Sequence, residues 1–116
     1  MEEEETVFET TDRLGRRVRY RKVIYERHIP EHPEMADYLE EAADTVHDPD
    51  YEVREEPDNK EEFRRTYYKM GLGRDDFEMC FIKVPVYYDR IGGEVATVHF
   101  CRQLARGKLL WRRGQN

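Results

Sequence analysis

Two histidines, a lysine and a threonine in this 116-residue chain carry the groups that acid-base chemistry on a phosphodiester requires. Cleavage of RNA without a metal needs a general base for the 2′-hydroxyl proton, a general acid for the leaving oxygen, and cations or hydroxyl donors for the charged phosphorane. Imidazole, ammonium and hydroxyl groups can fill these roles. The candidate catalytic residues are therefore His28, Lys83, Thr97 and His99.

Most other catalytic motifs are missing from the sequence. It contains no Gly-rich phosphate loop, no nucleophile elbow and no H-E-x-x-H motif. His28 and His32 have the spacing of two imidazoles that bind one metal on a continuous helix. Pro30 and Pro33 interrupt that helix, so we predict no metal site and no cofactor.

Arg64, Tyr68 and Tyr87 are candidates for substrate binding. Tyr67 and Tyr68 point to opposite faces of a strand, so one of them is expected to reach the open face of the sheet and stack on a base. An ordinary structural interpretation also exists, with half-buried sheet tyrosines and an edge arginine that discourages aggregation. Arg64 gains a functional role only if it borders the face that carries Thr97.

Strand alternation indicates how the candidate side chains are positioned. In residues 77–88 and 94–104 many alternate side chains are apolar, as expected for strands with one face in the core. The predicted core-facing set is Cys80, Ile82, Val84, Val86, Ala96, Val98, Phe100 and Leu104. The opposite face of the sheet is then predicted to carry Lys83, Tyr87, Thr97 and His99.

The sequence predicts an α+β fold. A hairpin, a short helical turn ended by Pro30 and a longer helix opened by Pro33 are followed by a series of strands. The expected elements are strands 6–11 and 16–24, helical segments 25–29 and 33–46, and strands at about 50–55, 62–69, 77–88, 94–103 and 108–112. No crossover helix fits between the later strands. We therefore expect an antiparallel sheet of four or more strands with both helices packed on it.

The length suits one domain, which we place at residues 6–113, between a disordered acidic N-terminus at 1–5 and a tail at 114–116. No apolar run is long enough to span a membrane, and the N-terminal glutamates are opposite in charge to a secretory signal, so a cytoplasmic protein is expected. Residues 1–60 contain 9 Lys and Arg against 19 Asp and Glu, whereas residues 61–116 contain 11 against 7. A polyanion is therefore expected to approach only the C-terminal half.

Several short motifs occur along the chain in a characteristic order. They are His28-Ile29, His32-Pro33-Glu34, Pro49-Asp50, Tyr67-Tyr68, a hydrophobic strand ending near Lys83, Thr97, and Leu110-Trp111. Their order and spacing over residues 12–112 resemble the phage and bacterial Barnase-EndoU-Colicin-RelE-like (BECR) nuclease families. The resemblance implies helices followed by an antiparallel sheet, ribonuclease activity, and a toxin-like role with an inhibitor protein as partner. The active-site positions that it implies are His28 and Thr97, with Lys83, Arg64 and Tyr68 near them.

The sequence departs from the family pattern at two places. Tyr25 stands where these families often have Trp, and Thr97-Val98-His99 stands where they often have Thr-Ala-Tyr. His99 adds a titratable group beside Thr97, which would either strengthen acid-base catalysis or accompany a repurposed surface. The acidic N-terminal half favours a structured or protein-bound RNA over bulk RNA as the substrate.

Two functions of different classes follow from these patterns. One is a metal-independent endoribonuclease, or an inactive relative of one. The other is a non-catalytic module that binds a protein through the open sheet face or the basic hairpin. Convergence of His28, Thr97 and His99 in one concave pocket would favour the enzyme, whereas scattered side chains would favour the binding module.

Overall fold

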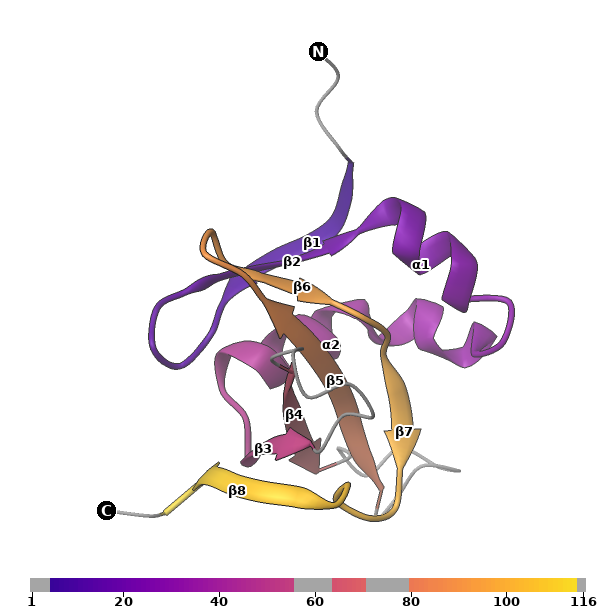
Figure 1. Cartoon of the computed structure of the whole chain (residues 1–116). Helices are drawn as coiled ribbons and strands as arrows, with labels where there is room; N and C mark the ends of the chain where they lie inside the picture. The colour runs from indigo at the N-terminus through magenta and orange to yellow at the C-terminus, as the bar shows by residue number, and fades with distance from the viewer. Residues whose placement is uncertain (1–4, 56–63, 71–79, 115–116) are drawn as a thin grey trace.

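The protein has an α+β fold in which helices pack on a large sheet (Figure 1). The computed structural model describes residues 5–55, 64–70 and 80–114. The fold class predicted from the sequence is confirmed. Outside the described residues lie parts of four predicted segments, at 1–4, 62–63, 77–79 and 115–116. Among the described residues, no helix is both long enough and apolar enough to cross a membrane.

The elements follow the predicted order along the chain. The N-terminal part contains β1 (Thr6–Thr11), β2 (Arg17–Arg21), α1 (Lys22–His28), the 3₁₀ helix η1 (Pro33–Tyr38) and α2 (Leu39–His47). The strands that follow are β3 (Tyr51–Glu55), β4 (Arg64–Met70), β5 (Phe81–Tyr88), β6 (Gly93–Val95), β7 (His99–Cys101) and β8 (Gly107–Arg112).

The N-terminal hairpin closes through the side chain of Asp12. This carboxylate accepts hydrogen bonds from the backbone N–H groups of Leu14 and Arg16, at 3.0 and 2.8 Å. The N–H of Gly15 donates to the Asp12 carbonyl oxygen at 3.0 Å. Gly15 has a φ of 85°, which a residue without Cβ adopts at little cost. The predicted turn is therefore confirmed, with an aspartate and a glycine as its determinants.

The helical region begins earlier than predicted and contains two kinds of helix. α1 starts at Lys22, directly after β2. Pro33 opens a 3₁₀ helix, and the chain becomes α-helical only at Leu39. Short 3₁₀ segments are frequent at the ends of α-helices. Residues 33–47 are nevertheless helical throughout, so the longer predicted helix is present.

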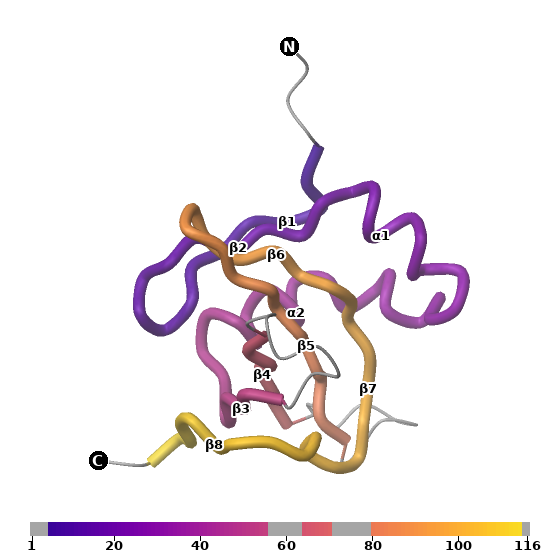
Figure 2. The backbone as a smooth tube through the Cα atoms, viewed as in Figure 1, coloured from indigo at the N-terminus to yellow at the C-terminus, as the bar shows by residue number. Residues whose placement is uncertain are grey.

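Strands far apart in the sequence form one mixed sheet. Within the described residues, the strand order is β1-β2-β6-β5-β4-β3-β8, and β7 pairs with β5 beyond the end of β6 (Figure 2). All these pairs are antiparallel except β2 with β6, which is parallel. β6 lies between β5 and β2, and its parallel pairing with β2 joins the N-terminal hairpin to the strands of the C-terminal half.

A one-residue shift in register divides the predicted strand 94–103 into β6 and β7. Val95 pairs with Val86, whereas His99 pairs with Lys83, so β5 advances by three residues while the other chain advances by four. An extra residue of this kind is a β-bulge, which locally interrupts pairing. The interruption lies beside Pro85, which has no N–H to donate to a neighbouring strand.

The register shift changes which residues of this segment enter the core. Val95 and Val98 are buried, whereas Ala96 is only partly buried and Leu104 is exposed. The predicted core positions of Ala96 and Leu104 are therefore wrong. His99 still lies on the predicted side, because it pairs with Lys83.

The hydrophobic core lies between the helices and one face of the sheet. α2 packs on β1, β4 and β5, and η1 contributes the buried Met35. The core residues are Val18, Tyr20, Met35, Ala42, Val46, Tyr67, Ile82, Val84, Val86, Val95 and Val98. The sheet face that is directed away from this core is called the outer face below.

Candidate functional site

Strand pairing brings six charged and aromatic side chains together on the outer face. Tyr68 pairs with Lys83, and Lys83 pairs with His99 on its other side. Along β5, Ile82 and Val84 flank Lys83 and enter the core, so Lys83 must point outward. We call the group the outer-face cluster, which consists of Glu55, Arg64, Tyr68, Lys83, Tyr87 and His99.

Glu55 holds the two cations of the outer-face cluster. Its carboxylate oxygens lie 2.9 Å from Arg64 Nε and 3.0 Å from Lys83 Nζ. The side chains of Glu55, Arg64 and Lys83 keep 11%, 26% and 16% of their surface exposed, so solvent reaches the ion pairs only in part. Two cations against one carboxylate leave an excess of positive charge. The site therefore favours an additional anionic group, such as a phosphate.

The two tyrosines of the outer-face cluster differ in accessibility. Tyr68 is fully buried, and its hydroxyl accepts a hydrogen bond from the backbone N–H of Ala105 at 2.8 Å and donates a long one to Glu55 Oε1 at 3.4 Å. Burial raises the pKa of Tyr68 above its usual range. Tyr87 is only partly buried, and its ring lies 5.6 Å from Arg64 Cζ. Only Tyr87 thus offers accessible ring surface to a ligand.

His99 has the strongest electrostatic perturbation of the histidines in the described chain. Burial, followed by the positive charges of Lys83, His32 and Arg64, lowers the pKa of His99 to about 4, against the opposing effect of Glu55. Its Nδ1 atom is buried and has no hydrogen-bond partner among the described residues. His99 is therefore a neutral imidazole at neutral pH, which can accept a proton.

The His99 ring stacks on His32, a contact that the sequence did not reveal. The ring centroids are 5.5 Å apart and the planes meet at 21°. His32 lies between α1 and η1, where its N–H donates to the carbonyl oxygens of His28 and Ile29 at 3.2 and 3.1 Å. These backbone bonds hold His32 against the edge strand β7.

His28 and Thr97 lie apart from the outer-face cluster. His28 is in the last turn of α1 and lines a narrow hollow that also includes His32 and Val98 but neither Thr97 nor His99. Thr97 is in the irregular segment between β6 and β7 and is partly buried. Within the described residues, no hydrogen bond or ion pair joins His28 or Thr97 to the cluster. Lys83, His99, Arg64, Tyr68 and Tyr87 are the candidate residues that the structure brings together.

Sequence reasoning missed Glu55 and the contact of His32 with His99. Glu55 could have been found by assuming that the strands at 50–55 and 62–69 form a hairpin, since antiparallel pairing then places Glu55 next to Arg64. His32 could not, because its contact with His99 depends on how the turn between Pro30 and Pro33 meets a distant strand. Local patterns carry no information on such a tertiary contact.

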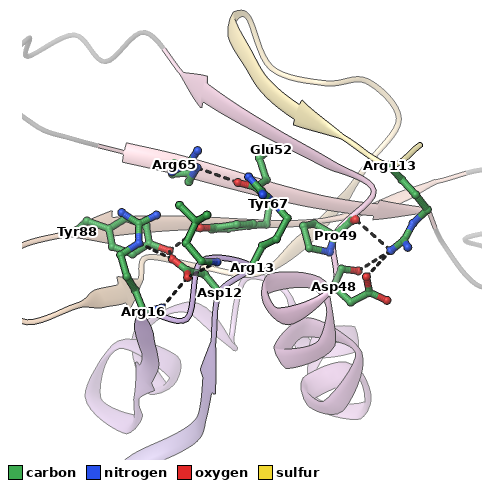
Figure 3. Close-up of polar contacts among 11 residues, drawn as sticks. Asp12, Arg13, Arg16, Asp48, Pro49, Glu52, Arg65, Tyr67, Tyr88 and Arg113 are labelled. Atoms are coloured by element: carbon green, nitrogen blue, oxygen red, sulfur yellow. Dashed lines mark hydrogen bonds and ion pairs between the residues drawn. The ribbon is translucent and has the colours of Figure 1, made fainter. Parts of the chain in front are cut away.

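A second polar group lies on the side of the sheet that faces the helices (Figure 3). Asp12 accepts hydrogen bonds from Arg16 Nε at 2.7 Å and from the Tyr88 hydroxyl at 2.8 Å, and the Tyr88 and Tyr67 hydroxyls are 2.5 Å apart. Glu52 pairs with Arg13 Nε at 2.7 Å and with Arg65 Nε at 3.0 Å. Both carboxylates are held by these partners, so the group connects the hairpin turn to the sheet.

Potential metal ligands do not gather in the part of the chain that the structure describes. No group of three His, Cys, Asp or Glu side chains there could hold a metal ion. Cys80 and Cys101 are free, and the first is buried while the second is partly buried. Burial raises the pKa of the Cys101 thiol, which disfavours its reactive thiolate form.

Comparisons with known proteins do not identify a family for this chain. No family model, no curated protein and no solved structure matches it. Structural support for a catalytic function therefore comes from the outer-face cluster alone.

Proposed function

We propose that the protein is a metal-independent endoribonuclease of the BECR type. The observation that carries the proposal is the meeting of Lys83, Arg64 and the neutral imidazole of His99 on one partly exposed patch of the outer face. Two fixed cations can stabilise the charge that develops on the phosphorane, and a neutral imidazole can take the 2′-hydroxyl proton.

The remaining members of the outer-face cluster support these roles. Glu55 bridges Arg64 and Lys83 and so fixes the separation of the two cations before a substrate arrives. The partly exposed ring of Tyr87, beside Arg64, provides a surface on which a base can stack. The acidic N-terminal half favours a structured or protein-bound RNA as substrate, and the resemblance adds an inhibitor protein as partner.

The first prediction tests cleavage with a matched pair of lysine variants. Wild-type protein and Lys108→Ala should cleave a fluorescently labelled RNA in the presence of EDTA, because Lys108 is an exposed residue of β8 outside the outer-face cluster. Lys83→Ala should be slower by roughly 10²-fold to 10³-fold, as is typical when one transition-state donor is lost. Both substitutions remove one positive charge, so a general charge effect would slow them equally.

Intact RNA after incubation with folded wild-type protein would contradict the nuclease proposal. It would favour the second candidate, a non-catalytic module that binds a protein through the outer face. Two observations support that candidate. Both cations of the cluster already have Glu55 as a counter-ion. His28, Thr97 and His99 do not meet in the hollow that His28 lines, and scattered side chains are the arrangement stated above to favour a binding module.

A further inference from the structure

We propose that one edge of the sheet docks on a membrane surface that contains anionic phospholipids. This edge is formed by β8 and by the connection that leads to it from β7. We call it the C-terminal edge and define it by six exposed side chains, which are those of Arg102, Leu104, Arg106, Lys108, Leu109 and Arg112. The contact is made by surface side chains and needs no membrane-spanning segment. The inference goes beyond the proposed nuclease activity and does not depend on it.

The C-terminal edge carries positive charge and contains no negative charge of its own. Residues 95–116 include five Lys and Arg and no Asp or Glu. One of the five, Arg113, is paired with Asp48 and Asp50, at 2.7 Å each. Within the described chain, no ion pair is formed by the other four, which are Arg102, Arg106, Lys108 and Arg112. These four cations are therefore available to the phosphate groups of lipids.

Two leucines of the C-terminal edge favour a lipid surface over a nucleic acid. Leu104 and Leu109 are 36% and 48% exposed, and Arg106 and Lys108 lie between them in the sequence. A phosphate-sugar backbone would pair with the cations and leave the leucines in water. The boundary between lipid headgroups and acyl chains accepts both kinds of group, because long basic side chains reach the headgroups while apolar neighbours enter the acyl region.

Several contacts hold the C-terminal edge in place. The backbone N–H of Ala105 donates to the Tyr68 hydroxyl at 2.8 Å, which fixes the connection between β7 and β8. β8 pairs with β3 from Gly107 to Arg112, and Arg113 binds the chain that follows α2. In Figure 1, β8 and the connection from β7 run along the end of the molecule opposite to α1. The cations and leucines are therefore ordered before they meet a lipid surface, which lowers the cost of docking.

Vesicle flotation with matched variants tests the contribution of charge. The wild type should bind vesicles of phosphatidylcholine and phosphatidylglycerol and should not bind phosphatidylcholine alone. Lys108→Ala should lower the partition coefficient by roughly fivefold, the loss expected when one cation is removed from an anionic lipid surface. Lys22→Ala, a control at the start of α1 whose ammonium pairs with Glu5 at 3.0 Å, should leave binding unchanged.

A pair of leucine variants tests the contribution of apolar surface in the same assay. Leu109→Ser should lower the partition coefficient by roughly threefold to tenfold, because less apolar surface then enters the acyl region. Leu14→Ser changes a leucine that is 59% exposed in the hairpin turn and should have no effect. All four substituted side chains are exposed, so the variants should keep the wild-type fold, and circular dichroism melting curves check this.

The single tryptophan reports which surface meets the lipid. Trp111 lies on β8, so nitroxide-labelled phosphatidylcholine in anionic vesicles should quench its emission. Absence of vesicle binding, equal binding to neutral and anionic vesicles, unquenched Trp111 in the bound protein, or equal losses for Lys108→Ala and Lys22→Ala would overturn the proposal. Binding of polyglutamate or an oligoribonucleotide that depends on Lys108, without vesicle binding, would assign the C-terminal edge to a protein or a nucleic acid instead.

Discussion

At the scale of single residues, His99 links protonation to stability. Burial and its cationic neighbours lower its pKa from the ordinary value of 6.5 to about 4. Between these values the unfolded chain binds a proton at this position and the folded chain does not. The free energy of unfolding therefore falls as the pH decreases from about 6.5 to about 4, and this penalty is absent above that window.

The prediction at this scale follows from that linkage. His99→Gln should weaken the decrease in stability between pH 7 and pH 4.5, because glutamine does not titrate. Urea unfolding at the two pH values measures the effect, and an NMR titration of the imidazole protons locates the His99 transition near 4. A His99 transition near 6.5, or equal pH dependence in the wild type and His99→Gln, would contradict the assigned environment.

Period-two alternation made part of the site predictable. Lys83, Tyr87 and His99 were placed on the outer face from the sequence, since a strand sends successive side chains to opposite sides. Alternation alone does not reveal where a β-bulge adds a residue to a strand. The sequence therefore predicts Ala96 on the core side of the sheet, whereas Val95 occupies that side in the structure. The same method could not bring His32 to His99, because their contact joins a turn to a distant strand.

At the scale of elements, the hairpin turn is fastened to the sheet by Asp12. This buried carboxylate accepts hydrogen bonds from Arg16 and from Tyr88 on β5. Burial alone would raise the pKa of Asp12, but the hydrogen bonds from Arg16 and Tyr88 outweigh it and lower the pKa. The stabilisation by Asp12 is therefore present at neutral pH and is lost as the pH falls through this lowered pKa.

The prediction at this scale compares two acidic residues of the hairpin. Asp12→Ala leaves the Tyr88 hydroxyl and two backbone N–H groups without their acceptor and should lower the free energy of unfolding by about 2–3 kcal/mol. Glu9→Ala removes an exposed ion pair with Arg17 and should have little effect. Urea titrations of both variants at pH 7 measure the difference, and equal stabilities would show that the turn is not fastened through Asp12.

The helices and strands are largely predictable from the sequence, whereas the pairing of the strands is not. The turn residues Asp12 and Gly15 and the prolines at 30 and 33 marked boundaries that the structure confirms. The parallel pairing of β2 with β6 depends on residues about 75 positions apart, such as Arg19 and Glu94, which local periodicity cannot relate. The sequence therefore specifies most elements, while the sheet order follows from packing of the whole chain.

At the scale of the whole molecule, charge is distributed unequally around the sheet. The helical segments carry the acidic side chains Glu34, Asp37, Glu40, Glu41 and Asp44. The outer-face cluster has an excess of positive charge, with Glu55 between Arg64 and Lys83. A nucleic acid is therefore expected to approach the outer face and to be repelled by the helices. The number of phosphates that it contacts there should be small.

The final prediction measures that number through the salt dependence of binding. Each phosphate neutralised on a single strand contributes about −0.7 to the slope of log K against log salt concentration. Contacts from Lys83 and Arg64 alone should thus give a slope of about −1.4 for a single-stranded oligoribonucleotide. Fluorescence anisotropy with the His99→Gln protein measures binding without cleavage.

The lysine pair again provides the control for this measurement. Lys83→Ala in the same background should reduce the slope to about −0.7, because one of the two proposed phosphate contacts is lost. Lys108→Ala removes the same charge from an exposed position on β8 and should leave the slope unchanged. A slope that does not respond to Lys83→Ala would place the bound strand elsewhere. A slope well beyond −1.4 would mean that the strand also contacts cations outside the outer-face cluster.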